Sequence, residues 1–174
     1  MKINDINKKV YRKHLNQIIL GFIATLLCLS LLFSSVLIYF WGVSAEQIIN
    51  GESNFRLNLV GVILALISCS VILYNIRTSD FFKEVYYVWQ MKQVQNLIYR
   101  KLGKITLAAK NDEVNALIIL HYYYESLIHI YQLDDNTITL NELVKKQQAL
   151  QQQIEDKQLT ISSCQFNKSL LKTY

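Results

Sequence analysis

The stretch from Ile18 to Trp41 contains no charged side chain, and it constrains the fold more than any other feature of the sequence. At about 1.5 Å per residue, a helix of this length reaches roughly 36 Å. The hydrocarbon core of a bilayer is only about 30 Å thick. A helix in a soluble core would rarely run so far without a polar face. The stretch therefore predicts a helix that spans a membrane with some tilt.

A second uncharged stretch follows, from Leu57 to Ile76, and as a helix it would be about 30 Å long. The residues between the two stretches, 42–56, include the turn signal Asn50-Gly51. The sequence thus predicts a transmembrane hairpin over 18–76, with spans at 18–41 and 57–76. The apolar region of a secretory signal is only about 7–15 residues long, so we expect the first span to stay in the mature protein.

The basic residues are distributed unevenly around the two spans. Five of them precede the first span, Arg56 alone lies in the loop, and Arg77, Lys83 and Lys92 come shortly after the second span. Because Lys and Arg favour the cytoplasmic side of a membrane, this pattern predicts that both termini are cytoplasmic. The N-terminal segment 1–17 has two interpretations: it is a short amphipathic helix that lies on the lipid headgroups, or it is a solvated basic tail.

Two further sets of residues follow from this topology. Small residues at helical spacing predict the surface through which the two spans pack: they are Gly21, Thr25 and Cys28 in the first span, and Gly61, Ala65 and Cys69 in the second. Basic and aromatic residues near the span ends predict contacts with the membrane interface: they are Lys8, Lys9, Arg12, Lys13, Trp41, Arg77 and Trp89. Mid-membrane ionisable residues, which mark ion pathways, are absent from both stretches.

The second half of the chain predicts a cytoplasmic helical domain over 77–158 with about three helices. The first helix begins at Ser79 or Asp80 and bends near Gly103. The second is the central helix, which starts after Asn111-Asp112-Glu113 and ends near Leu133. The third follows a capping box of Thr139 and Glu142. Residues 159–174 are expected to form a loosely ordered C-terminal tail. The chain has no proline, and the fold class is therefore an all-α membrane protein.

One face of the central helix carries His121, Glu125 and His129 at a spacing of four residues. Imidazole and carboxylate groups are ordinary ligands of zinc and iron. However, His and Glu four residues apart are also common as simple surface pairs. We therefore treat the three residues as metal candidates only, and we expect no metal and no cofactor. Asp134-Asp135-Asn136 lacks the glycine and the glutamate spacing of a calcium loop.

The remaining patterns argue against catalysis and against nucleic-acid binding. The sequence has neither a phosphate-binding glycine loop nor a nucleophile elbow. Its net charge of +5 could indicate nucleic acid, but five basic residues precede the first span, where anionic lipid explains them better. The three cysteines, at positions 28, 69 and 164, have no disulfide or metal spacing. We expect no enzyme activity and no nucleic-acid partner.

Three functional hypotheses remain. The leading one is a membrane-anchored helical interaction or scaffold module, whose cytoplasmic helices bind a protein partner or associate with themselves. The first alternative is a subunit of a small oligomeric channel, although the spans carry no selectivity element. The second alternative is a metal-dependent enzyme that uses His121, Glu125 and His129.

Three runs of sequence also carry a family resemblance: EVYYVWQMKQVQNLIYRKL, FRLNLVGVIL and LDDNTITLNELV, together with the basic start KKVYRKHLN. With these runs the chain resembles an uncharacterised family of proteobacterial two-span inner-membrane proteins, a domain of unknown function. The resemblance extends over nearly the whole chain. It implies the two-span topology and a bacterial origin, and it implies nothing about mechanism.

Overall fold

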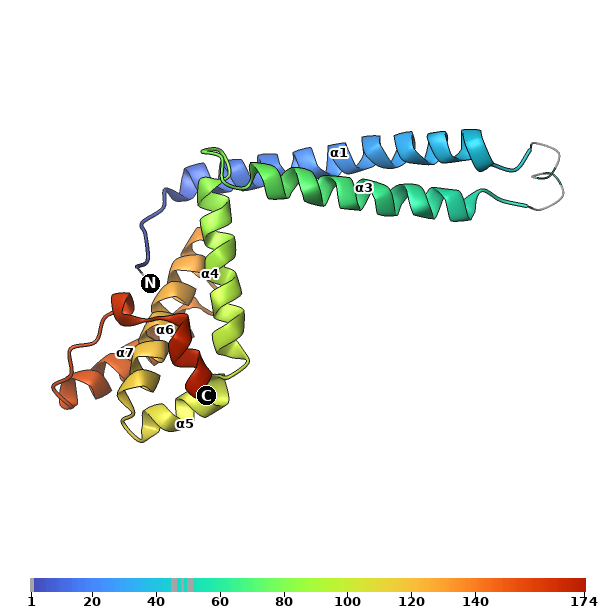
Figure 1. Ribbon diagram of the computed structural model, residues 1–174. Coiled ribbons are helices and arrows are strands. Elements are labelled where there is room, and N and C mark those ends of the chain that lie inside the picture. The colour runs from blue at the N-terminus through green and yellow to red at the C-terminus, as the bar shows by residue number, and fades with distance from the viewer. Residues whose placement is uncertain (1, 45–46, 48, 50–51) are drawn as a thin grey trace. The chain divides into compact units, whose positions relative to one another are not determined.

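A computed structural model describes residues 2–44, 47, 49 and 52–174 (Figure 1). Every regular element among these residues is a helix, which confirms the predicted all-α class. The chain divides into two compact units, one formed by Met1–Arg12 with Glu84–Tyr174 and the other by Lys13–Lys83. We call the first the helical unit and the second the hairpin unit. The helix α1 (Lys8–Trp41) contributes to both units.

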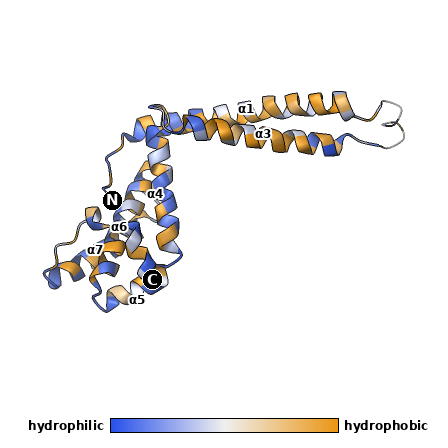
Figure 2. Cartoon of the chain, in the orientation of Figure 1, coloured by the Kyte–Doolittle hydropathy of each residue, from blue (hydrophilic) through white to orange (hydrophobic). Residues whose placement is uncertain are grey.

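The hairpin unit contains most of α1 together with α3 (Phe55–Ile76). Both helices are long and apolar enough to cross a membrane, and Figure 2 shows that they are mostly apolar apart from the polar N-terminal part of α1. The two helices pack as the predicted hairpin. Ser34 Oγ of α1 donates to the backbone oxygen of Asn58 in α3 at 3.4 Å. Near the loop, Asn54 Oδ1 accepts the Val43 backbone N–H at 2.9 Å. The predicted turn Asn50-Gly51 lies outside the described residues.

The helical unit contains α4 (Lys83–Tyr99), α5 (Leu102–Lys110), α6 (Val114–Leu133) and α7 (Leu140–Asp156). Two short 3₁₀-helices complete it, η1 (Ser163–Gln165) and η2 (Lys168–Thr173). As predicted, α6 is the central helix: it contacts α5, α7, η1 and η2. Its apolar side chains surround most of its circumference, so several neighbours can pack on it at once.

The first predicted helix of this unit is two helices, α4 and α5. The helix is interrupted at Arg100-Lys101, before Gly103. There the Lys101 backbone N–H donates to the Ile98 carbonyl three residues back. The tight turn allows α5 to pack against α6. Gly103 itself lies inside α5, with open space around its Cα. The glycine is therefore not the residue that causes the bend.

Two of the predicted breaks between helices are present, and each contains an acidic residue with a left-handed backbone conformation. Asp112, between α5 and α6, has φ 61°, and Asp135, between α6 and α7, has φ 56°. Asn and Asp tolerate this conformation better than other side chains that have a Cβ. The capping box predicted at Thr139 does not form, because its side chain makes no cap hydrogen bond. Glu142 instead pairs with Lys146 at 2.7 Å, one turn along α7.

The tail after Leu159 is packed, so the expectation of loose order was wrong. Phe166 is 2 % exposed and Leu171 is also buried. Both belong to the core of the helical unit with residues of α4, α5, α6 and α7. Lys101 Nζ holds this segment by donating to the Leu171 backbone oxygen at 2.7 Å. Burial of these apolar side chains explains why a sequence with little periodicity is ordered.

Candidate functional site

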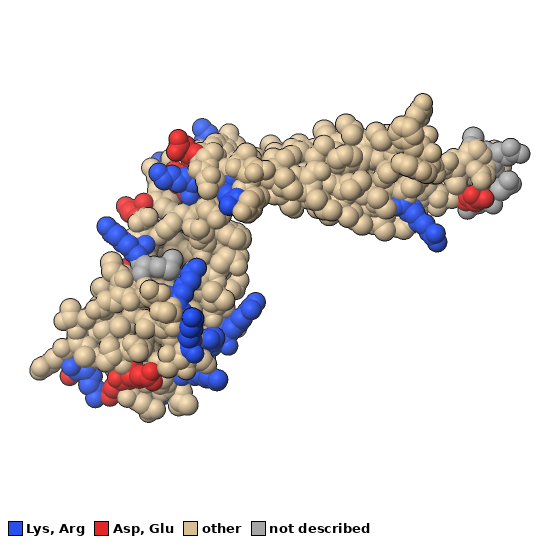
Figure 3. Space-filling model, in the orientation of Figure 1, with Lys and Arg blue, Asp and Glu red and all other residues tan. Residues whose placement is uncertain are grey.

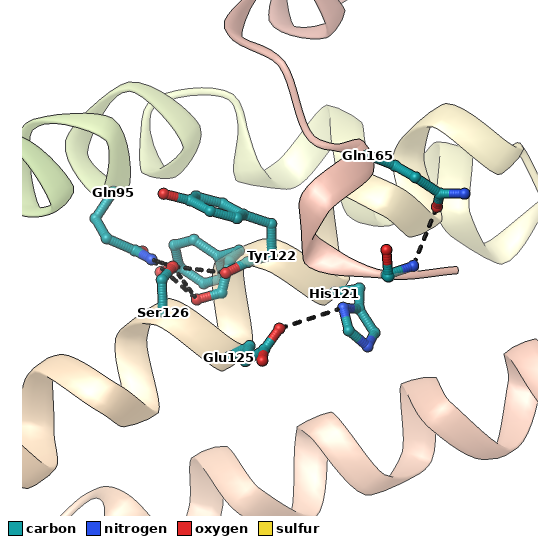
Figure 4. A network of polar contacts seen from close by, with 8 residues as sticks. Gln95, His121, Tyr122, Glu125, Ser126 and Gln165 are labelled. Atoms are coloured by element: carbon teal, nitrogen blue, oxygen red, sulfur yellow. Dashed lines mark hydrogen bonds and ion pairs between the residues drawn. The ribbon is translucent and has the colours of Figure 1, made fainter. Parts of the chain in front are cut away.

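The most buried polar contact of the helical unit joins α4 to α6. The Gln95 side chain donates to the Tyr123 backbone oxygen at 3.0 Å and also to Ser126 Oγ. Ser126 Oγ in turn donates to the Tyr122 backbone oxygen at 2.5 Å. Figure 4 shows Gln95 and Ser126 pointing toward one another between the two helices. Because the neighbours of Ser126 are an amide and carbonyl oxygens, this arrangement fixes helix packing and offers no base to activate the hydroxyl.

The three metal candidates lie along one face of α6, but they do not gather. His121 Nδ1 is 3.7 Å from Glu125 Oε2, and the two side chains lie next to each other (Figure 4). Nε2 of His129 is buried and has no hydrogen-bond partner within the described part of the chain. Burial lowers the pKa of His129, against the opposing charges of Asp5 and Glu125. Among the described residues, no group of three or more His, Cys, Asp or Glu side chains is placed to hold a metal ion.

A cluster that the sequence analysis missed surrounds the turn between α6 and α7. Asp134 accepts a hydrogen bond from the hydroxyl of Tyr11 at 3.0 Å and pairs with Lys92 Nζ at 2.7 Å. Asp135 pairs with both Lys8 and Arg12. Lys8 and Arg12 were predicted to contact the membrane interface, but the structure places them on this acidic turn. Lys92 and Asp134 are 42 residues apart and the other partners are more than a hundred residues apart, so no local pattern could have revealed the cluster.

The N-terminal segment before α1 also packs on the helical unit. The Asn4 backbone N–H donates to the hydroxyl of Tyr87 at 2.8 Å, and that hydroxyl donates to the Lys2 backbone oxygen. Ile3 packs against the core. The segment is thus neither a separate amphipathic helix nor a solvated tail. Asn7 caps α1, because its side-chain oxygen accepts the backbone N–H groups of Lys9 and Val10.

The predicted packing face of the second span is buried, whereas that of the first span is not. Gly61, Ala65 and Cys69 are the buried residues of α3. A Cβ placed on Gly61 would collide with Ser34 Oγ and lie 2.8 Å from the Ser34 backbone nitrogen. Gly61 is therefore needed for the close approach of the two helices.

Gly21, Thr25 and Cys28 of α1 are all exposed, so the small residues predicted to form the packing face of α1 do not form it. The half-buried face of α1 combines two serines with larger apolar residues: Ile18, Phe22, Leu26, Leu29, Ser30, Phe33, Ser34, Leu37 and Ile38. The closest approach joins two small residues, Ser34 of α1 and Gly61 of α3. Gly21 and Thr25 instead line an open groove with Cys69.

The remaining interface candidates are exposed or lie at helix ends. Trp41 ends α1 with its ring exposed, and Lys9 and Lys13 are exposed as well. Arg77 follows α3, and its guanidinium lies 3.4 Å from the centroid of the Tyr74 ring. Trp89 lies on α4, 53 % exposed, and stacks on Tyr86 with ring centroids 5.7 Å apart.

An exposed apolar and basic surface covers the corner between α4 and α5. Tyr99 is 67 % exposed and Leu107 is 64 % exposed. Both line one shallow hollow together with Arg100, Leu102, Gly103, Thr106 and Lys110. Figure 3 shows that basic side chains gather over this part of the helical unit. We call these seven hollow-lining residues the α4–α5 surface. Sequence reasoning missed it, because it assigned this stretch to one continuous helix.

The fold thus defines an all-α protein in which a hairpin of two candidate membrane helices is joined to a packed helical unit. The chain belongs to the DUF3087 family, described as a protein of unknown function, whose model matches residues 1–171. This confirms the predicted membership of an uncharacterised family. No curated protein and no solved structure matches the chain.

Proposed function

We propose that this protein is a membrane-anchored interaction module of the bacterial inner membrane. In this proposal the hairpin spans the bilayer, both termini are cytoplasmic, and the helical unit binds an acidic protein partner through the α4–α5 surface. The observation that carries the proposal is that this surface combines exposed Tyr99 and Leu107 with Arg100 and Lys110 around one hollow.

The apolar exterior of the hairpin supports a membrane location. Leu20, Leu31 and Leu59 are exposed on α1 and α3, as are many other large apolar side chains of these helices. In water this exterior would far exceed the few hundred Å² of contiguous apolar surface that soluble monomers expose. In a bilayer the same side chains face lipid, and the backbone polar groups are satisfied within each helix.

The orientation rests on the distribution of charge. Arg56 begins α3 on the loop side, whereas Lys9, Lys13, Arg77 and Lys83 lie near the other ends of the two helices. Short loops that are poor in Lys and Arg are normally exported. The helical unit, which contains both termini, would therefore lie on the cytoplasmic side.

The chemistry of the α4–α5 surface indicates the kind of partner. Leu107 and the ring of Tyr99 offer apolar area at the hollow, and Arg100 and Lys110 border the same hollow. A partner segment that alternates apolar and acidic side chains would bury its apolar face there and place its carboxylates near the two cations. Exposed apolar area beside complementary charge is typical of a regulated protein contact.

The topology is tested with reporters that are active only outside the cytoplasm. A fusion after Tyr174 should be inactive, and an insertion near Gly51 should be active. The reverse pattern would overturn the cytoplasmic position of the helical unit. Fractionation of the untagged protein tests the membrane location by itself, because a module without spanning helices would be extracted by alkaline carbonate.

The surface is tested by site-specific photocrosslinking in intact cells. A photoreactive residue at Leu107 should give one dominant adduct, whereas one at exposed Gln152 on α7 should not. Charge reversal of Arg100 and Lys110 to Glu should reduce that adduct at least tenfold, and Lys145→Glu on α7 is the matched control. Equal adducts from both positions, or an adduct insensitive to the reversal, would contradict the proposed surface.

A pore-forming assembly and a metal-dependent enzyme stay predictions from the sequence alone. No contact among the described residues favours either over the interaction module. A purified complex whose mass corresponds to several chains around one axis would support the channel alternative. Stoichiometric zinc or iron, lost on His121→Ala or His129→Ala, would support the enzyme.

A further inference from the structure

The hairpin unit contains a groove of about 260 Å³ near the end of the two helices that is opposite the loop. It is lined by Gln17, Ile18, Gly21, Phe22, Thr25, Cys69, Ile72, Leu73, Ile76, Phe81 and Phe82. Most of these side chains are aliphatic or aromatic. We infer that this groove binds one acyl chain of an anionic phospholipid, whose headgroup lies among the basic residues at the groove's open end. The inference rests on the membrane location proposed above.

The groove exists because the two helices pack closely at one level and separate at another. At Gly61 the contact with Ser34 leaves no room for a Cβ. At Gly21 the situation is the opposite, since a Cβ placed there would meet nothing within 4 Å. The small residue in α1 therefore widens a space between the helices instead of closing it.

The lining is suited to a hydrocarbon chain. Ile18 and Phe22 from α1 face the same space as Ile72, Leu73 and Ile76 from α3. Inside a bilayer such a space is not left empty, because unfilled volume forfeits the dispersion contacts of its lining. Water is a poor occupant as well, since it needs two to four polar partners. A flexible acyl chain fills the volume and needs no polar partners, and lipid acyl chains are the most abundant groups at this depth.

The segment after α3 closes one side of the groove with aromatic rings. Phe81 and Phe82 both line it, and their rings meet edge to face with centroids 5.5 Å apart. The ring of Phe81 also packs against His14 at 4.5 Å between centroids. The rings thus border one side of the groove, and Gln17 supplies a polar side chain at its open end.

Charge at this end identifies the headgroup. Lys13 precedes Gln17 by one helical turn and so lies on the same face of α1. Arg77 directly follows Ile76, and Lys83 directly follows Phe82. Asp80 is the only acidic residue between Lys13 and Lys83 near this end of the hairpin. The excess of positive charge favours a negatively charged phosphate ester over a zwitterionic one.

The test uses the full-length chain, extracted without detergent in a polymer nanodisc and analysed by native mass spectrometry. We expect one retained phospholipid per chain, with phosphatidylglycerol preferred at least tenfold over phosphatidylcholine after exchange into mixed vesicles. Gly21→Leu places a leucine side chain in the groove, where its Cβ meets nothing within 4 Å, and should reduce retention at least tenfold. Thr25→Leu, on the next turn of the same lining, should have the same effect, so a folding defect in one variant does not decide the outcome.

Two matched controls separate the groove from general effects of hydrophobicity and charge. Ala24→Leu places a leucine on α1 at an exposed position outside the groove and should retain lipid as the wild type does. Lys13→Gln with Lys83→Gln should abolish the preference for phosphatidylglycerol, whereas Lys145→Gln with Lys168→Gln should preserve it. Retention of a free fatty acid in place of a phospholipid would overturn the assignment of the headgroup.

Other results would contradict the binding of lipid in the groove. Equal loss of lipid in Gly21→Leu and Ala24→Leu, or unchanged retention in both groove variants, would show that lipid binds elsewhere on the hairpin. A wild-type chain that fractionates with membranes but retains no phospholipid would overturn the groove and leave the anchored module intact. A chain that does not fractionate with membranes would overturn both.

Discussion

The ring of Phe166 stacks on the ring of Tyr122, with centroids 4.2 Å apart and planes 11° from parallel. Phe166 comes from the last residues of the chain, and Tyr122 lies in the middle of the central helix. Both are 2 % exposed. Burial raises the pKa of the Tyr122 hydroxyl to about 12. The C-terminal segment therefore completes the core of the helical unit.

Removing this ring should destabilise the helical unit strongly. Phe166→Ala leaves a cavity against Tyr122, and such changes cost about 3–5 kcal/mol of unfolding free energy. Ile138→Ala is the matched control, because Ile138 is 92 % exposed and surface changes usually stay within about 0.5 kcal/mol. Chemical denaturation followed by circular dichroism measures both. Similar stability of the two variants would show that the C-terminal segment is not part of the core.

The hairpin should tolerate added bulk at one glycine and not at the other. Gly61→Leu forces α3 away from Ser34, and overpacking of this kind costs about 1–3 kcal/mol. Val62→Leu, on an exposed part of the same helix, should be nearly neutral. Gly21→Ala should also be neutral, since a Cβ there meets open space. Thermal unfolding in a mild detergent compares the three variants, and equal melting temperatures would contradict the contact at Gly61.

The helical elements were predictable because their signals are local. Two long uncharged stretches indicated the hairpin, and the breaks near Asp112 and Asp135 were marked by residues that tolerate left-handed backbone. The loss of the capping box at Thr139 could not be foreseen, since Glu142 had a competing partner in Lys146. Two interactions of similar strength compete there, and sequence spacing does not decide between them.

The contacts that the sequence did not reveal are those between distant segments. Phe166 shows no helical or strand periodicity with its neighbours, and its burial depends on a space left open beside Tyr122. In the hairpin, small residues on α1 were expected to mark the contact face, as they do on α3. The small residue of α1 at the closest contact is Ser34, which meets Gly61, whereas Gly21 lies beside a groove.

In the acidic turn after α6, Asp134 should contribute more than Asp135 to the stability of the helical unit. Asp134 bonds the nearly inaccessible Tyr11 hydroxyl at 3.0 Å, and a hydrogen bond to a charged group is worth about 1.5–3 kcal/mol. Asp135 pairs with Lys8 and Arg12, and all three side chains are about half exposed. Exposed pairs of this kind contribute about 0–1 kcal/mol.

Two double-mutant cycles measure this difference. The cycle of Tyr11→Phe with Asp134→Asn should give a coupling energy above 1 kcal/mol that changes little with salt. The cycle of Lys8→Gln with Asp135→Asn should give a smaller coupling that decreases further at high ionic strength. Comparable couplings in the two cycles would show that burial of the Tyr11 hydroxyl does not strengthen its bond.

His129 should make the stability of the helical unit depend on pH between about 5 and 7. Its pKa in the folded protein is lowered from the model-peptide value of 6.5, chiefly because the ring is buried, while Asp5 and Glu125 act in the opposite direction. Just below pH 6.5 the unfolded chain therefore binds more protons than the folded one, so the free energy of unfolding decreases as the pH falls.

His129→Gln removes the titrating group and keeps a polar side chain of similar size. The variant should lose less unfolding free energy than the wild type when the pH is lowered from 7 to 5, as measured by urea denaturation at each pH. Both proteins should still lose stability below about pH 4, because hydrogen bonds from Lys157 and Gln153 lower the pKa of Asp112 in the folded protein, so the unfolded chain binds a proton there first. Parallel curves for the two proteins between pH 7 and 5 would show that His129 titrates identically in the folded and unfolded states.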